Sequence, residues 1–246
     1  MKILEIIVIM FLSFISTAQY SVPAPIFPLE MKWRHISETQ TGLVMACFSF
    51  GSLIAPALMT GWIYQWYGRR GAVQLGILVL ALALLFYAIS YFIPDRFKLL
   101  FVILSGMTRF MEGLGSTGSL TAFISLISKI YPEEVALALT AWGIGSSTGI
   151  CLGIIIGSLL FSLIGYFGVF LILSIVTFLT IFFILIFKES YNGEGYPNGE
   201  LSLTYSHILK PRWTVMVLLG YFCSAYLFYS LEPTLALKLR GDFHFS

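Results

Sequence analysis

Residues 105–115 read Ser-Gly-Met-Thr-Arg-Phe-Met-Glu-Gly-Leu-Gly. They place Arg109 and Glu112 inside a segment, from Leu99 to about Ser128, that otherwise resembles a membrane-spanning helix. A charge at the centre of such a helix costs about 2.5–3.5 kcal/mol, so proteins that keep one usually turn it toward a bundle interior or a water-filled path. The two residues are three apart, so one helix face carries both and they can pair.

The depth of Arg109 follows from the same segment. If the helix starts near Lys98, eleven residues at a rise of ~1.5 Å place Arg109 about 16 Å deep, near the middle of the bilayer. A side chain at that depth does not easily reach the interface. The pair is therefore either a functional site or a structural ion pair that holds neighbouring helices together.

Composition sets the broad class of the protein. Hydrophobic residues make up 58% of the chain and charged residues 11%, which is more apolar surface than a soluble core of this length can bury. The sequence therefore predicts a polytopic membrane protein with the lipid bilayer as its main solvent. The net charge of +2 has no basic run behind it, which argues against a nucleic-acid partner. No His, Cys or carboxylate cluster has the spacing of a catalytic or metal site, so neither an enzyme nor a metal site is expected.

Hydropathy predicts seven membrane-spanning segments. On hydropathy alone, residues 1–190 hold six spans, residues 191–212 form a long polar linker, and residues 213–246 hold a seventh span. The predicted spans are roughly 3–24, 40–64, 72–93, 99–128, 135–162, 167–187 and 213–237.

The basic residues favour an N-terminus in the cytoplasm, although by a narrow margin. That orientation puts seven Lys and Arg residues in cytoplasmic loops and six outside, with Arg109 in the membrane. We therefore expect a multi-pass integral membrane protein of a vesicular or other endomembrane, or of the plasma membrane.

Two glycine-containing patterns accompany the charged segment. In the loop after the second span, Gly61, Gln65 and Gly68 precede Arg69 and Arg70, a pattern typical of a tight glycine turn that holds two cations at the cytoplasmic surface. In the fifth span, Gly149, Gly153 and Gly157 recur every four residues. This spacing leaves one helix face nearly bare and allows a partner helix to approach closely.

Three of these stretches together resemble the major facilitator superfamily of transporters. The loop resembles the superfamily's loop signature, with Gln65 where the family usually has aspartate. Arg109, Gly113 and Gly115 match its fourth-span pattern, in which the arginine is associated with proton coupling. The resemblance implies that Arg109, with Glu112, carries proton coupling, and that a proton gradient, not a cofactor, drives transport.

The fifth span adds a qualification about the direction of transport. Residues 145–158 resemble the antiporter signature of the superfamily, but Ile154 and Ser158 replace its usual proline and second glycine. Antiport is the expectation that the resemblance carries, and symport stays an alternative.

Two further stretches narrow the resemblance to the vesicular amine transporter branch, especially its vesicular polyamine transporter-like members. They are Pro-Ala-Pro-Ile-Phe-Pro at 23–28 and Leu-Glu-Pro-Thr-Leu at 231–235. The first closes the first span, and the second keeps a charge, Glu232, where the family generally has aspartate. Glu232 is either a substrate or proton site or a hydrated carboxylate at a helix end.

The first span departs from the monoamine and acetylcholine members of this branch. They carry an aspartate in the middle of that span to bind the amine, and Ser16 stands at that position here. Ser13, Ser16 and Gln19 lie at helical spacing and form one polar stripe. The stripe either faces a substrate cavity or makes hydrogen bonds between helices.

The superfamily fold has twelve spans in two six-helix halves, with the substrate bound between them. The resemblance therefore implies an all-α membrane protein with a major facilitator fold, truncated to the first six-helix bundle plus a seventh helix. Residues 1–190 are expected to form the N-terminal six-helix bundle, residues 191–212 the cytoplasmic central linker, and residues 213–246 the first helix of the C-terminal bundle, whose remainder is absent. Transport would then need the missing C-terminal half or another chain. The resemblance implies proton-coupled antiport of small organic cations such as amines or polyamines. The alternatives are a truncated, non-transporting membrane partner or regulator, and a seven-helix receptor.

Overall fold

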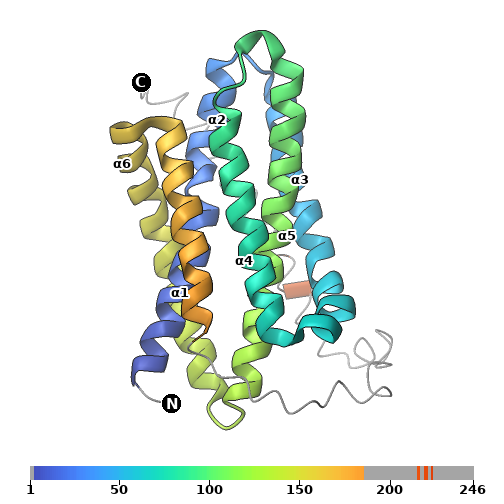
Figure 1. Ribbon diagram of the computed structural model, residues 1–246, viewed down its shortest axis with the longest axis vertical. Helices are drawn as coiled ribbons and strands as arrows, with labels where there is room; N and C mark the ends of the chain where they lie inside the picture. The colour runs from blue at the N-terminus through green and yellow to red at the C-terminus, as the bar shows by residue number, and fades with distance from the viewer. Residues whose placement is uncertain (1–2, 186–214, 217–218, 221–222, 224–246) are drawn as a thin grey trace. The chain divides into compact units, whose positions relative to one another are not determined.

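The described residues form helices and contain no strand, which confirms the all-α prediction. The computed structural model describes residues 3–185 and, beyond them, 215–216, 219–220 and 223 (Figure 1). The chain divides into two units, Met1–Ser190 and Tyr191–Ser246, and nearly all described residues belong to the first. The predicted linker at 191–212 and the greater part of the predicted seventh span lie outside the described residues.

The helices of the first unit follow the predicted spans closely (Figure 1). In chain order they are α1 (Ile3–Ser21), α2 (Pro23–Trp33), α3 (Glu38–Leu58), the π-helical η1 (Met59–Ile63), α4 (Tyr64–Ser90), the 3-10 turn η2 (Asp95–Phe97), α5 (Lys98–Ile130) and α6 (Val135–Ile184). The predicted second to sixth spans all fall on these elements.

Two glycines reverse the chain inside elements that count as continuous helices. α6 has 50 residues, about 75 Å of helix against the ~30 Å of a bilayer core. It turns back at Gly165, where φ is 68° and ψ is −176°. Gly68 has nearly the same backbone angles within α4. Side chains disfavour this positive-φ conformation, so glycine marks both turns, as the predicted loops required.

The first span is longer than predicted. The prolines at 23–28 do not end the helix, because Val22 keeps helical angles (φ −64°, ψ −46°) and α2 continues to Trp33. Pro23 occupies the start of α2, where a missing N–H costs little. Residues 29–33, expected in a loop, are therefore helical.

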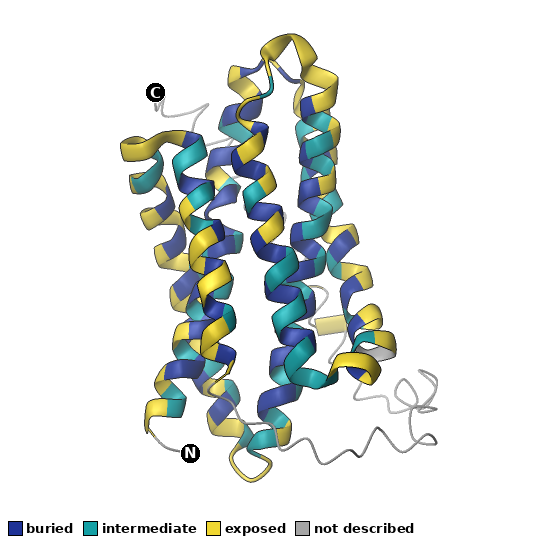
Figure 2. Cartoon of the chain, viewed as in Figure 1, coloured by how far each residue is buried: buried dark blue, intermediate teal, exposed yellow. Residues whose placement is uncertain are grey.

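The surface of the unit is that of a membrane protein. The helical stretches Ile3–Trp33, Glu38–Leu58, Tyr64–Ser90 and Val135–Ile184 are long and apolar enough to cross a membrane. The large apolar side chains of Leu53 and Leu163 are 77% and 78% exposed, and exposed positions (yellow) recur along the outward sides of the helices in Figure 2. Lipid is the solvent that suits such a surface.

The helix α5 packs between α3 and α4, and glycines set the distance on both sides. A Cβ at Gly113 would collide with the carbonyl of Phe48 on α3. A Cβ at Gly115 would lie 2.6 Å from the backbone nitrogen of Leu80 on α4. Both contacts are backbone to backbone, so α5 carries its charges into a closely packed position.

The four-residue glycine spacing of α6 lies against α1. A Cβ at Gly149 would collide with Thr17 and the carbonyl of Phe14, and one at Gly153 would collide with Ser21. At Gly157 a Cβ would lie 2.7 Å from the side chain of Val22. The partner of the glycine face is therefore the first helix.

Gly149→Ala should destabilise the protein, because the added methyl group forces α1 and α6 apart. The expected loss is about 1–3 kcal/mol in the free energy of unfolding, the usual range for an overpacked interior. Thermal unfolding of the purified protein in detergent measures it. Gly143→Ala is the matched control on the same helix, since a Cβ there meets nothing within 4 Å. Equal melting temperatures for the two variants would contradict the packing described.

Candidate functional site

The site is built on the middle of α5, where Arg109 and Glu112 point into the unit. Both side chains are buried, and Arg109 Nη1 donates a hydrogen bond of 3.0 Å to Glu112 Oε2. The three-residue spacing on one helix face brings them together. The pair expected from the sequence is thus formed, and it is shielded from the surroundings.

Aromatic rings from two other helices cover the arginine. The guanidinium carbon of Arg109 lies 5.3 Å from the ring centre of Phe27 on α2 and 5.6 Å from that of Tyr87 on α4. A cation over an aromatic face is attracted by the ring quadrupole, more strongly where water is excluded. The charge is therefore stabilised by its carboxylate and by two rings.

The pair keeps unused hydrogen-bonding capacity. Nε and Nη2 of Arg109 and Oε1 of Glu112 are buried and make no hydrogen bond to any described residue, and neither does Oγ of the adjacent Ser105. Leaving such atoms unpaired in an apolar interior is costly. A site of this kind can bind a proton or a polar group, which a fully satisfied structural ion pair cannot do as readily.

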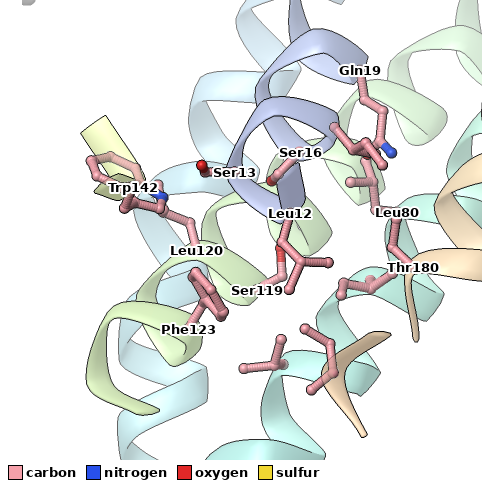
Figure 3. Close-up of a pocket in the computed structure, with 14 residues that line it drawn as sticks. Leu12, Ser13, Ser16, Gln19, Leu80, Ser119, Leu120, Phe123, Trp142 and Thr180 are labelled. Atoms are coloured by element: carbon pink, nitrogen blue, oxygen red, sulfur yellow. The ribbon is translucent and has the colours of Figure 1, made fainter. Parts of the chain in front are cut away.

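The polar stripe of the first span lines a small cavity. Ser13, Ser16 and Gln19 of α1 lie on the wall of a cavity of about 30 Å³, together with residues of α4, α5 and α6 (Figure 3). Gln19 is buried, and its Oε1 makes no hydrogen bond within the described part of the chain.

Neighbouring residues of α1 make the hydrogen bonds between helices. The hydroxyl of Thr17 donates to the carbonyl of Ser146 at 2.9 Å, and that of Ser21 donates to the carbonyl of Gly149 at 3.4 Å. The stripe thus lines a cavity, while Thr17 and Ser21 make hydrogen bonds that join α1 to α6.

The two arginines of the predicted loop signature, Arg69 and Arg70, connect the Gly68 turn to two other helices. Arg69 Nε donates to Ser125 Oγ on α5 at 2.8 Å, and Arg70 Nη2 donates to the carbonyl of Leu185, which caps the C-terminal end of α6, at 3.2 Å. A cation at this end of a helix is favourable because the helix dipole is negative there. Gln65 is exposed beside the turn, and Gly61 lies in η1.

Two further predictions concern Glu232 and a metal site. Glu232 lies outside the described residues. Among the described residues, no group of three or more His, Cys, Asp or Glu side chains is arranged to hold a metal ion.

Sequence reasoning missed a second charged cluster, around Arg34. Arg34 Nε donates to Glu30 Oε1 at 2.8 Å, its Nη1 lies 3.4 Å from Asp95 Oδ1, and its guanidinium also donates to the carbonyls of Tyr91 and Ile93. The prediction treated Arg34 as a loop cation. The four-residue spacing of Glu30 and Arg34 was the available signal for a helical pair.

A model of the Major Facilitator Superfamily matches residues 9–246. The chain belongs to the major facilitator superfamily. The expected fold class, an all-α membrane protein of the major facilitator type, is therefore confirmed, and the chain is an integral membrane protein. Members of this superfamily are in general transporters and not enzymes.

Named relatives agree with the expected branch. The mouse MFS-type transporter SLC18B1 is 25% identical over 227 residues, which are 92% of this chain and 48% of the relative. The human protein of the same name is 24% identical over 92% of this chain and 48% of the relative. A mouse probable small intestine urate exporter is 27% identical over 76% of this chain and 40% of its own length.

The chain spans about half the length of the curated relatives it matches. No solved structure matches it. The activity of a whole superfamily transporter therefore comes to this chain as a proposal.

Replacing one member of the buried pair should be worse than replacing both. Arg109→Met or Glu112→Leu alone leaves an uncompensated buried charge and should cost about 3–5 kcal/mol in the free energy of unfolding. The double variant should recover most of that loss, because no charge then remains to be buried. Denaturation of the four proteins in detergent gives the coupling energy. Additive losses would show that the two side chains do not act as a pair.

Proposed function

We propose that the chain forms one half of a secondary active transporter that exchanges protons for small organic cations such as amines or polyamines. The observation that carries the proposal is the buried Arg109–Glu112 pair with a free carboxylate oxygen. Intramembrane ionisable residues that face a bundle interior mark proton and substrate paths in transporters.

The pair supplies a direct means of coupling. While Glu112 is ionised, it holds Arg109 at 3.0 Å. A proton on Glu112 removes that attraction and leaves Arg109 a buried cation that needs another partner. Proton binding therefore changes which arrangement of the surrounding helices is favoured, which is the requirement for driving alternating access.

The acidic residues of the predicted spans and the resemblance to the vesicular amine transporter branch both support the proposal of a cationic substrate. Glu112 and Glu232 give a basic ligand two carboxylates, one of them already committed to Arg109. Ser16 and Gln19 of the cavity-lining stripe, with Glu232, are the proposed substrate residues. A relative named as a probable urate exporter makes urate a necessary comparison substrate.

Transport in this superfamily needs two bundles that move about a shared site. Because the chain spans about half the length of its relatives, we propose that it works with a C-terminal half or with another chain. The same half-length favours a second candidate, a non-transporting partner that regulates a complete transporter by assembling with it. Purification of the tagged chain from its own membranes distinguishes the two candidates. A co-purifying C-terminal half supports the half-transporter, and a co-purifying complete transporter supports the regulator.

Glu112→Gln should abolish proton-driven uptake, because the amide keeps the shape of the side chain but cannot carry the proton. The protein, purified with its natural partners, is placed in lipid vesicles with an imposed pH gradient. Uptake of radiolabelled spermidine and of urate is then followed. We expect spermidine uptake that collapses with the gradient and is lost in the variant, and no urate uptake.

Glu133→Gln is the control, since it removes the same charge from an exposed loop. Uptake with unchanged pH dependence in Glu112→Gln would rule out the coupling role. Urate uptake in place of spermidine uptake would overturn the cationic substrate.

The proposed orientation has the N-terminus, the Gly68 turn and the end of α6 in the cytoplasm. These segments lie at one end of the unit, since Arg70 reaches Leu185. An N-terminal tag in sealed, cytoplasmic-side-out vesicles should be digested by added protease, and a tag in the 91–97 turn should be protected. The reverse pattern would contradict the proposed orientation and place the N-terminus outside. The assay gives the orientation whichever membrane, vesicular, other internal or plasma membrane, holds the protein.

A further inference from the structure

Three buried oxygen-bearing side chains lead from the charged pair toward one end of the unit. They are Glu112 on α5, Tyr87 on α4 and Tyr166 on α6, each with 3% exposure or less. Glu112 Oε1 and both phenol oxygens make no hydrogen bond to any described residue. Three helices thus aim unsatisfied oxygens into the same interior region, and a phenol can both donate and accept a proton.

Tyr87 is the link to the pair. Its ring lies 5.6 Å from the guanidinium carbon of Arg109, and its phenol lies close to the Glu112 carboxylate. Tyr87 is completely buried. A proton on this phenol therefore has Glu112 as its nearest carboxylate, and it cannot come directly from solvent.

Tyr166 stands next to Tyr87 across a shared ring. Phe170 packs on Tyr87 with ring centres 4.9 Å apart and on Tyr166 with ring centres 4.7 Å apart. The two phenols lie close enough to interact electrostatically. Tyr166 is also within electrostatic range of Arg109 and of Glu30.

Beyond Tyr166 lies a pocket of about 640 Å³ that reaches the surface. Glu30, Arg34 and Asp95 line this pocket, the Arg34 pocket, together with Tyr166 itself. The side chain of Asp95 is 79% exposed, so water reaches the mouth. Glu30 and Asp95 both contact Arg34 and leave the mouth with one excess negative charge.

From this arrangement we propose that Tyr166 and Tyr87 form a proton relay that connects the Arg34 pocket with Glu112. The relay rests on the proposed function and names the route of the coupled proton. A bridging water joins two oxygens wherever they are further apart than a hydrogen bond. The other titratable and charged groups around the route are Arg109 on α5, Tyr20 on α1, and Glu30 and Arg34 at the end of α2.

The proton balance of the relay is simple. Water in the pocket gives a proton to the Tyr166 oxygen as Tyr166 passes its own proton to Tyr87. Tyr87 passes its proton to the Glu112 carboxylate, so both phenols end neutral, Glu112 gains one proton and the pocket water loses one. Rotation of the two hydroxyl groups resets the relay.

The test measures protonation of Glu112 directly, without substrate. A rapid drop in pH is applied to the purified protein in lipid nanodiscs, and infrared difference spectroscopy follows the carbonyl band of the protonated carboxyl. The band is assigned to Glu112 by its loss in Glu112→Gln. Tyr166→Phe and Tyr87→Phe keep the rings and remove hydroxyls that have no described partner, so both variants should fold.

We expect each Tyr→Phe change to slow the appearance of the band by roughly a hundredfold, the lower end of the range for a lost proton-transfer group, with its final size unchanged. Tyr91→Phe is the control, because Tyr91 lines the same pocket but is half exposed at its mouth. Unchanged rates in Tyr166→Phe and Tyr87→Phe, or a Glu112 band that never appears in the wild type, would overturn the relay.

The outcome is separable from that of the proposed function. If uptake depends on protons and on Glu112 while the tyrosine variants protonate at the normal rate, the relay is wrong and antiport stands. If the tyrosine variants slow protonation but no proton-driven uptake of spermidine occurs, the relay stands and antiport is wrong. If Tyr166→Phe does not fold, Tyr87→Phe alone decides.

Discussion

A charge pair that is kept out of water constrains the whole first unit. Arg109 and Glu112 lie on a helix bounded by α3 and α4, and the close approach of those helices at Gly113 and Gly115 excludes solvent from the pair. Separating the charges in such surroundings is costly, so the pair survives only if the helices around it hold their positions. The same packing that protects the charges therefore makes the helix arrangement sensitive to whether Glu112 carries a proton.

Family membership and local geometry contribute different parts of the functional argument. The match to the major facilitator superfamily over residues 9–246 gives the fold and the general class of protein. The geometry of α5 adds a carboxylate with one committed and one unsatisfied oxygen. The chain spans about half the length of its relatives, and the pair is the feature of this half on which the proposed coupling depends.

The sequence predicted the helices from hydropathy and a tight glycine turn at Gly68, which does adopt positive φ. Hydropathy also separated the fifth and sixth spans, where Gly165 reverses the chain. It also predicted the Arg109–Glu112 pair from helical spacing alone. It failed where the outcome depends on neighbours distant in the chain. The prolines after Val22 were expected to close the first span, and Arg34 was counted among the six basic residues of the outside loops. Only the packed unit brings Arg34 to the carbonyls of Tyr91 and Ile93, 57 and 59 residues away.

The same three features follow one another along α1 and α2, along α4 and, in the reverse chain direction, along α5, and their order bears on coupling. Along α1 and α2, the cavity residues Ser16 and Gln19 come first, then Phe27 against Arg109, then Glu30 at the Arg34 pocket. On α4, Val73 to Leu80 line the cavity, Tyr87 contacts Arg109, and Tyr91 follows at the pocket. The helix α5 runs in the opposite direction. Its Phe101 lies against Arg34, the charged pair follows, and Ser119 and Phe123 then line the cavity. The charged pair thus lies between a surface pocket and the small cavity that Ser16 and Gln19 help to line. In the proposed relay, a proton that enters from the pocket binds Glu112 and neutralises the carboxylate that holds Arg109. The proton need not travel on to the cavity, because the change in charge on this one carboxylate is what links the two ends of the unit.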